Sequence, residues 1–220
     1  MPSLWFDIAH LFAGGVLVLS LVLLYQDRIT SAINVFALQA ITLALSVGWQ
    51  AFIRSEPLLL VTALLALVVK GFVIPTALHR IVRRLEIHRE VEKVVGVGAA
   101  LMVGLALTGL AQALVLKVAT GMASHAREDL ALALAIILLG FLMMIVRRNA
   151  VTQVVGFMSM ENGLILAATG ARGMPLVVEI SVTFSILIAF IVIGIFLFRI
   201  RERFDTVDLQ ALDRFRGERR

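Results

Sequence analysis

The sequence predicts an all-α, polytopic membrane protein with seven transmembrane helices, an external N-terminus and an internal C-terminus. Hydrophobic residues make up 60% of its 220 residues and charged residues 16%, whereas soluble domains have about 45–50% and about 25%. The apolar residues fall into runs of roughly 20, the length that crosses a hydrocarbon core about 30 Å thick. The longest polar stretches, residues 79–93 and 199–220, are too short to form a core of their own. Residues 1–220 are therefore expected to form a single integral membrane domain.

Seven apolar runs, each bounded by charge or proline, are the expected helices: residues 4–24, 29–53, 57–78, 94–118, 130–146, 149–169 and 176–198. The first run lacks the basic region and the cleavage site of a secretory signal, so we expect it to remain as a membrane helix. An odd number of helices places the termini on opposite sides. With the N-terminus outside, 15 Lys and Arg residues lie inside and four outside, which strongly favours this orientation. Residues 199–220 then form a basic cytoplasmic tail.

The chain contains no cysteine, which excludes disulfides, thiolate zinc sites, cysteine-ligated iron–sulfur clusters and a thiol nucleophile. No cofactor is expected, and we do not expect the chain to catalyse a reaction by itself. The net charge of +5 is explained by the membrane topology, because no extramembrane domain is available to bind nucleic acid. The expected surrounding is the lipid bilayer.

Two opposite charges lie at nearly the same depth in the predicted membrane. Lys70 comes ten residues before Arg80, which places it about 15 Å from the inner boundary. Glu161 comes 13 residues after Arg148, which places it about 20 Å from the same boundary. Each charge would cost about 2.5–3.5 kcal/mol at the centre of an isolated helix, so both are expected to point into protein or a hydrated cavity. Such charges mark ion or proton routes more often than ion pairs that only dock helices.

Other polar residues in the predicted helices have two interpretations each. Gln39 lies about 17 Å deep and is placed to hydrogen-bond into the layer of the two charges, although for Gln39 and Asn34 ordinary hydrogen bonding between helices is an equal alternative. Asp7 and His10 either line a proton exit or sit at the level of the lipid headgroups. Glu179 is close enough to the outer boundary to reach water.

Two features concern helix packing. Gly96, Ala100, Gly104 and Thr108 recur at intervals of four, a ridge of small residues that allows another helix to approach closely. The partner of this ridge is either in this chain or in another. Pro75 lacks an amide donor and is expected to kink or end the third helix.

Several segments resemble, in order along the chain, component E of hydrogenase-4, a membrane subunit of formate hydrogenlyase-type complexes. They are Lys70 followed by Pro75, residues 148–156 continuing to the Met-Glu-Asn-Gly segment at 160–163, the opening of the seventh helix at 178–180, and residues 205–212. The resemblance covers most of the chain from about residue 57 onward.

The resemblance implies a non-catalytic membrane subunit of a complex-I-like, redox-driven ion-pumping assembly in a bacterial or archaeal plasma membrane. The implied partners are antiporter-like and quinone-site-type membrane subunits and, through the complex, a hydrogenase-like peripheral arm. Residues 149–198 would belong to a three-helix unit, about 130–198, similar to the K subunit of NADH:quinone oxidoreductase and to the C subunit of multisubunit sodium/proton antiporters.

Two helix carboxylates of the K subunit take part in proton translocation, and Glu161 matches the first of them. Ser185 takes the place of the second, and Glu179, six residues earlier, is a doubtful substitute. The expected proton or sodium relay therefore consists of Glu161 and Lys70, with further polar groups supplied by Gln39, Asn162, Glu179 and Ser185. Two alternatives remain at this level, namely an autonomous secondary ion transporter and a structural scaffold of the membrane arm.

Overall fold

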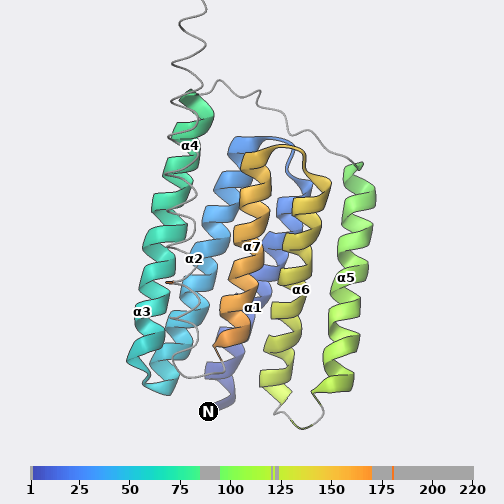
Figure 1. Ribbon diagram of the computed structural model, residues 1–220. Coiled ribbons are helices and arrows are strands. Elements are labelled where there is room, and N and C mark those ends of the chain that lie inside the picture. The colour runs from blue at the N-terminus through green and yellow to red at the C-terminus, as the bar shows by residue number, and fades with distance from the viewer. Residues whose placement is uncertain (1, 85–94, 120, 122–123, 170–179, 181–220) are drawn as a thin grey trace, which may run out of the picture. The chain divides into compact units, whose positions relative to one another are not determined.

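The computed structural model describes residues 2–84, 95–119, 121, 124–169 and 180. The chain divides into two units, Met1–Glu179 and Ile180–Arg220, and all the described residues except Ile180 belong to the first. Every element in the described part is a helix (Figure 1): α1 (Pro2–Tyr25), α2 (Ile29–Arg54), α3 (Pro57–Leu65), η1 (Ala66–Val73), α4 (Ile74–Arg84), α5 (Val97–Val118), α6 (Ser124–Val146) and α7 (Ala150–Ala168).

Six stretches of the described residues are helical, long and apolar enough to cross a membrane: Asp7–Tyr25, Ile29–Arg54, Pro57–Arg83, Val97–Val118, Ala126–Val146 and Ala150–Ala168. They coincide with the first six predicted runs. The all-α class is confirmed for the described residues, and these helices are compatible with a multi-pass membrane protein. The predicted seventh helix, 176–198, and the predicted tail, 199–220, lie outside the described residues, apart from Ile180.

Two helix ends differ from the predicted ones by six residues, and the others differ by at most three. α6 begins at Ser124, six residues before the predicted start at 130, and α4 ends at Arg84, six residues beyond the predicted end at 78. In both places charged residues bound the apolar run. A charged side chain at a helix end can reach water through its flexible stem, so the backbone remains helical after the apolar run has ended.

Of the two outcomes expected at Pro75, a kink or an end of the helix, the second does not occur. The helix continues through Pro75 to Arg84, and the eight residues before Ile74 form η1, a π-helix. At the end of η1, the backbone N–H of Ile74 donates to the carbonyl of Val69, five residues earlier. Proline removes a donor and crowds the carbonyl four residues before it, and the wider π-turns make room for the ring. Because π-helical turns are rare and often occur at functional sites, η1 directs attention to the residues that it carries.

α6 and α7 pack with their backbones in direct contact, through glycines on both helices. A Cβ atom added to Gly140 of α6 would lie 2.5 Å from the backbone nitrogen of Met160. A Cβ added to Gly163 of α7 would lie 2.8 Å from the carbonyl oxygen of Ala133. Small residues allow such close approach, which maximises van der Waals contact between helices. The position of α7 is thus fixed against α6 by steric contact.

The small-residue ridge of α5 packs within this chain at its middle, whereas Gly96 at its start is exposed. Ala100 and Gly104 are buried, and a Cβ added to Gly104 would meet Leu24 of α1 at 3.0 Å and Leu139 of α6 at 3.1 Å. The opposite side of α5 leaves many large apolar side chains exposed: Met102, Val103, Leu105, Leu110, Leu114, Leu116 and Val118. An exposed apolar face of this extent suits contact with lipid.

An apolar core lies where α1, α2, α3, α6 and α7 meet. Its buried members are Ala13, Val16, Leu43, Val47, Ala51, Leu59, Ala63, Leu132, Ala133, Ile136, Ile165 and Leu166. Gln39 of α2 and Glu161 of α7 lie on two of the same helices and are also buried. These polar side chains are therefore surrounded by protein.

Arg147, predicted only as an internal topology charge, is buried beneath the end of α1. Its Nη2 donates to the carbonyl oxygens of Leu23, at 3.2 Å, and of Leu24, at 2.8 Å. These carbonyls are at the C-terminal end of α1, where the helix dipole favours a cation. Burial lowers the pKa of Arg147 below its ordinary value, and the guanidinium nevertheless stays charged at neutral pH. Arg147 thus links the end of α6 to the end of α1.

Replacing Arg147 with glutamine is expected to lower the free energy of unfolding by about 1–3 kcal/mol, because two buried carbonyls lose their charged donor. The adjacent Arg148 is exposed, and the same change there is expected to stay within about 0.5 kcal/mol. Thermal unfolding of the detergent-solubilised protein, followed by circular dichroism, measures both variants. Equal stability of the two would show that Arg147 does not hold the end of α1.

Candidate functional site

Lys70 of η1 and Glu161 of α7 form an ion pair in the protein interior. The Nζ atom of Lys70 lies 3.0 Å from Oε1 of Glu161. The two side chains are 1% and 0% exposed, so neither faces lipid. The two residues are 91 positions apart in the sequence. Their contact agrees with the prediction, made from their distances to the helix ends, that they lie at nearly the same depth.

α7 carries much of the site because it is the most enclosed of the described membrane-length helices. Twelve of its 19 residues are buried, and it packs on α6 and α2. The contacts at Gly140 and Gly163 hold it against α6. Consecutive residues Glu161 and Asn162, which point in different directions on a helix, are therefore both surrounded by protein.

A row of hydrogen bonds extends from Lys70 across three further helices. Nζ of Lys70 donates to Oδ1 of Asn162 at 3.0 Å, and Nδ2 of Asn162 donates to Oε1 of Gln39 in α2 at 3.2 Å. Nε2 of Gln39 in turn donates to the hydroxyl oxygens of Ser20 in α1, at 2.7 Å, and Ser159 in α7, at 2.9 Å. The Ser20 hydroxyl ends the row by donating to the carbonyl of Val16. All the side chains in this row are buried.

The row satisfies the polar groups that burial would otherwise leave without partners. Both ends of the Asn162 and Gln39 amides are engaged, and the Lys70 ammonium meets a carboxylate and an amide oxygen. A buried ion pair of this kind is stabilised only when its geometry is good and further hydrogen bonds support it. The supporting hydrogen bond is on the lysine side, where Nζ also donates to Asn162, and the low polarity of the interior strengthens each interaction.

The structure brings together four of the six residues predicted for the relay: Lys70, Glu161, Gln39 and Asn162. The other two, Glu179 and Ser185, lie outside the described residues. Asn34, for which hydrogen bonding between helices was considered, is exposed instead.

Sequence reasoning missed two members of the site, Ser20 and Ser159. Ser159 precedes Asn162 by three residues, the spacing that puts two side chains on one helix face, so its position was detectable. Ser20 is the only hydroxyl residue between residues 11 and 24. An isolated hydroxyl in an apolar run is a weak signal, because it can bond to its own helix, as it also does here.

Asp7 and His10, the other candidates near the first helix end, are not equivalent. Nδ1 of His10 lies 2.9 Å from Oδ1 of Asp129, and its Nε2 lies 3.7 Å from Oε2 of Glu128, both in α6. Asp7 is exposed. His10 thus joins the beginnings of α1 and α6, well separated from the Lys70–Glu161 pair along the helices. Across the described residues, no group of three or more acidic or histidine side chains is arranged to hold a metal ion.

Over the residues that the structure describes, the chain is all-helical and compatible with a multi-pass membrane protein, and it holds a buried ion pair with an attached row of hydrogen bonds. Over 208 residues the chain is 28% identical to the uncharacterized protein Rv0085 of Mycobacterium tuberculosis, and the match covers 93% of this chain and 94% of that protein. No family model matches the chain, and no solved structure matches it. The similarity to Rv0085 extends over nearly the whole of both chains, so it is not confined to a local motif.

Proposed function

We propose that the chain is a multi-pass subunit of an ion-translocating membrane complex and that Lys70 and Glu161 form its proton-exchanging pair. The observation that carries this proposal is the direct contact between the two buried charges. Ionisable residues within apolar helices are costly and mark ion pathways by default. The function is translocation of protons, or of sodium ions, with the driving reaction carried out by other subunits.

The pair can exchange protons because the charge of each member controls the proton affinity of the other. A proton that reaches Glu161 neutralises the carboxylate and weakens its attraction for the ammonium. Loss of a proton from Lys70 changes the net charge of the site in the opposite direction. The amides of Asn162 and Gln39 neither gain nor lose protons in the physiological range, so their role is to orient the ammonium.

The charges at the helix ends support an external N-terminus. Of the described Lys and Arg residues other than Lys70, six lie at the end of the helices that includes the α1–α2 and α6–α7 connections: Arg28, Arg80, Arg83, Arg84, Arg147 and Arg148. Three lie at the other end, where the chain begins: Arg54, Lys117 and Arg127 (Figure 1). By the positive-inside rule, the proposed orientation puts the richer end in the cytoplasm, and the resemblance to hydrogenase-4 component E implies a bacterial or archaeal plasma membrane.

The resemblance to hydrogenase-4 component E supports a complex-I-like assembly of the formate hydrogenlyase type. Lys70 and the Glu161-Asn162 dipeptide are among the residues that carry the resemblance, and these are the residues that meet in the interior. Antiporter-like and quinone-site-type subunits, with a hydrogenase-like peripheral arm, are the partners that this assignment proposes.

The test is the Glu161→Gln variant, assayed in the complex purified through a tag on the full chain and reconstituted into liposomes. Proton transfer, measured with an internal pH-sensitive dye, is expected to fall at least tenfold, since the variant side chain cannot ionise. Electron transfer from the complex's donor to a soluble artificial acceptor is expected to persist. Glu56→Gln is the matched control, because it makes the same change at the α2–α3 connection, remote from the pair.

Unchanged proton transfer in Glu161→Gln would reject the relay and favour the scaffold alternative, in which the ion pair only docks helices. Purification resolves the other alternative. If the chain purified without partners moves protons or sodium ions across liposomes, it is an autonomous secondary transporter, and the assignment to a larger complex fails.

A further inference from the structure

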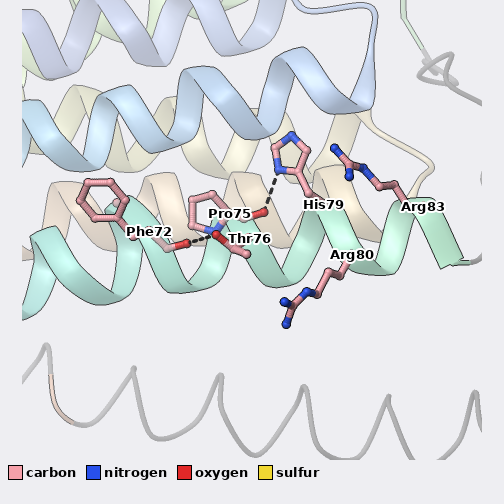
Figure 2. Close-up of a pocket in the computed structure, with 7 residues that line it drawn as sticks. Phe72, Pro75, Thr76, His79, Arg80 and Arg83 are labelled. Atoms are coloured by element: carbon pink, nitrogen blue, oxygen red, sulfur yellow. Dashed lines mark hydrogen bonds between the residues drawn. The ribbon is translucent and has the colours of Figure 1, made fainter.

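A pocket of 320 Å³ lies along the segment that runs from η1 into α4, beginning one residue after Lys70. Gly71 forms part of its wall, and the other lining side chains are Phe72, Pro75, Thr76, His79, Arg80 and Arg83 (Figure 2). The lining includes two arginines and a histidine and contains no acidic residue. The pocket therefore has the charge that attracts an anion.

The lining changes in character along the helix. Phe72 and Pro75 lie toward one end of the segment and Arg80 and Arg83 toward the other, as Figure 2 shows. From residue 71 to residue 83 the helix rises about 18 Å, which covers the depth from the middle of an apolar span to its end at Arg83. An occupant that fills the pocket must accordingly be apolar at one end and anionic at the other.

The two arginines at the charged end are available to such an occupant. Neither Arg80 nor Arg83 has an acidic partner among the described residues, and both side chains are exposed. The Nδ1–H of His79 donates to the carbonyl of Pro75 at 2.8 Å, which fixes the orientation of the ring. The Thr76 hydroxyl is held by the carbonyl of Phe72 at 2.7 Å.

We propose that this pocket binds an anionic phospholipid, with its headgroup within reach of the exposed, flexible side chains of Arg80 and Arg83, which Figure 2 shows on opposite sides of the helix, and an acyl chain lying against Phe72 and Pro75. Basic pockets at the cytoplasmic ends of transmembrane helices recognise anionic headgroups in this way. A free phosphate ion leaves the apolar part of the pocket unfilled, and an acidic peptide does not match a site that extends into an apolar span. The proposal does not depend on the proton-exchange function.

The experiment measures retention of phosphatidylglycerol and phosphatidylcholine by the detergent-solubilised full chain, using native mass spectrometry over a lipid titration. The wild type is expected to bind phosphatidylglycerol at least tenfold more tightly than phosphatidylcholine. Arg80→Gln/Arg83→Gln is expected to weaken phosphatidylglycerol binding about 30-fold, since each basic residue at a membrane surface contributes about a factor of five. Circular dichroism confirms that the variant is folded, which its exposed positions predict.

Arg28→Gln/Arg148→Gln is the matched control, because it removes two exposed arginines from the same end of the helices but outside the pocket. Its phosphatidylglycerol binding is expected to stay within twofold of wild type, and equal losses in both double variants would overturn the proposal. Competition identifies the source of the anion. If inorganic phosphate or deacylated glycerophosphoglycerol displaces the lipid at equal concentration, the pocket is a site for free anions and the lipid proposal is wrong. If polyglutamate displaces the lipid, the pocket is a peptide site and the lipid proposal is also wrong.

Discussion

Replacing Lys70 with methionine is expected to lower the free energy of unfolding by about 3–5 kcal/mol, because the change leaves the buried Glu161 carboxylate without its cation. Methionine keeps most of the apolar volume of the side chain, so the loss reports the charge rather than a cavity. Asn162 also loses its donor, which adds to the cost. Thermal or denaturant unfolding in detergent micelles, followed by circular dichroism, provides the measurement.

Lys117→Met is the control for Lys70→Met, since Lys117 is exposed at the end of α5 and its loss is expected to stay within about 0.5 kcal/mol. The double variant Lys70→Met/Glu161→Met completes the cycle. Removing both charges of a buried pair is often neutral or stabilising, so the double variant is expected to recover most of the lost stability. A Lys70→Met protein as stable as Lys117→Met would mean that the buried pair is not formed.

The double variant also separates folding from function. If it folds as well as the wild type and yet transfers no protons in the reconstituted complex, the pair is retained for ion transfer rather than for stability. If it folds and transfers protons normally, the proposed relay is wrong even though the ion pair exists.

Replacing Gly140 with alanine is expected to destabilise the protein by about 1–3 kcal/mol or more, the usual cost of overpacking. The new methyl group would lie 2.5 Å from the backbone nitrogen of Met160, and backbone atoms cannot move aside as a side-chain end can. α7 must therefore shift away from α6, and the shift displaces Glu161, the residue after Met160. The unfolding measurement used for the lysine variants applies here too.

Gly109→Ala in α5 makes the same chemical change where no atom lies within 4 Å. Alanine stabilises a helix interior by about 0.5–1 kcal/mol relative to glycine, so this variant is expected to be slightly more stable than wild type. The two substitutions thus have opposite predicted signs. Similar effects from both would show that α6 and α7 are not in backbone contact.

The sequence predicted most of the described fold because membrane helices are encoded by run length, which a single chain displays directly. It also predicted that Lys70 and Glu161 share a depth, since the rise per residue is fixed. It missed the π-helix, because a proline predicts a disturbance of its helix without specifying whether the helix kinks, ends or widens. The burial of Arg147 could not be predicted either. The sequence shows that Arg147 lies beside a helix end, but it does not show which carbonyl groups its side chain contacts.

The glycine contacts are a further part of the fold that the sequence did not predict. Gly140 lies in α6, and Gly156 and Gly163 lie in α7. Their spacing in the sequence does not indicate that they contact the facing helix. The ridge on α5 was recognised from its interval of four, yet its partners in α1 and α6 emerged only from the packing. Contacts that depend on how two surfaces meet require three-dimensional information.

The hydrogen bonds between Lys70 and Ser20 all run in one direction. A protonated lysine has no lone pair and can only donate, so Asn162 must present its oxygen, Gln39 must follow, and the two serines receive what remains. The positive charge of one nitrogen in η1 therefore sets which way two amides are turned, as far as the Ser20 hydroxyl in the first helix.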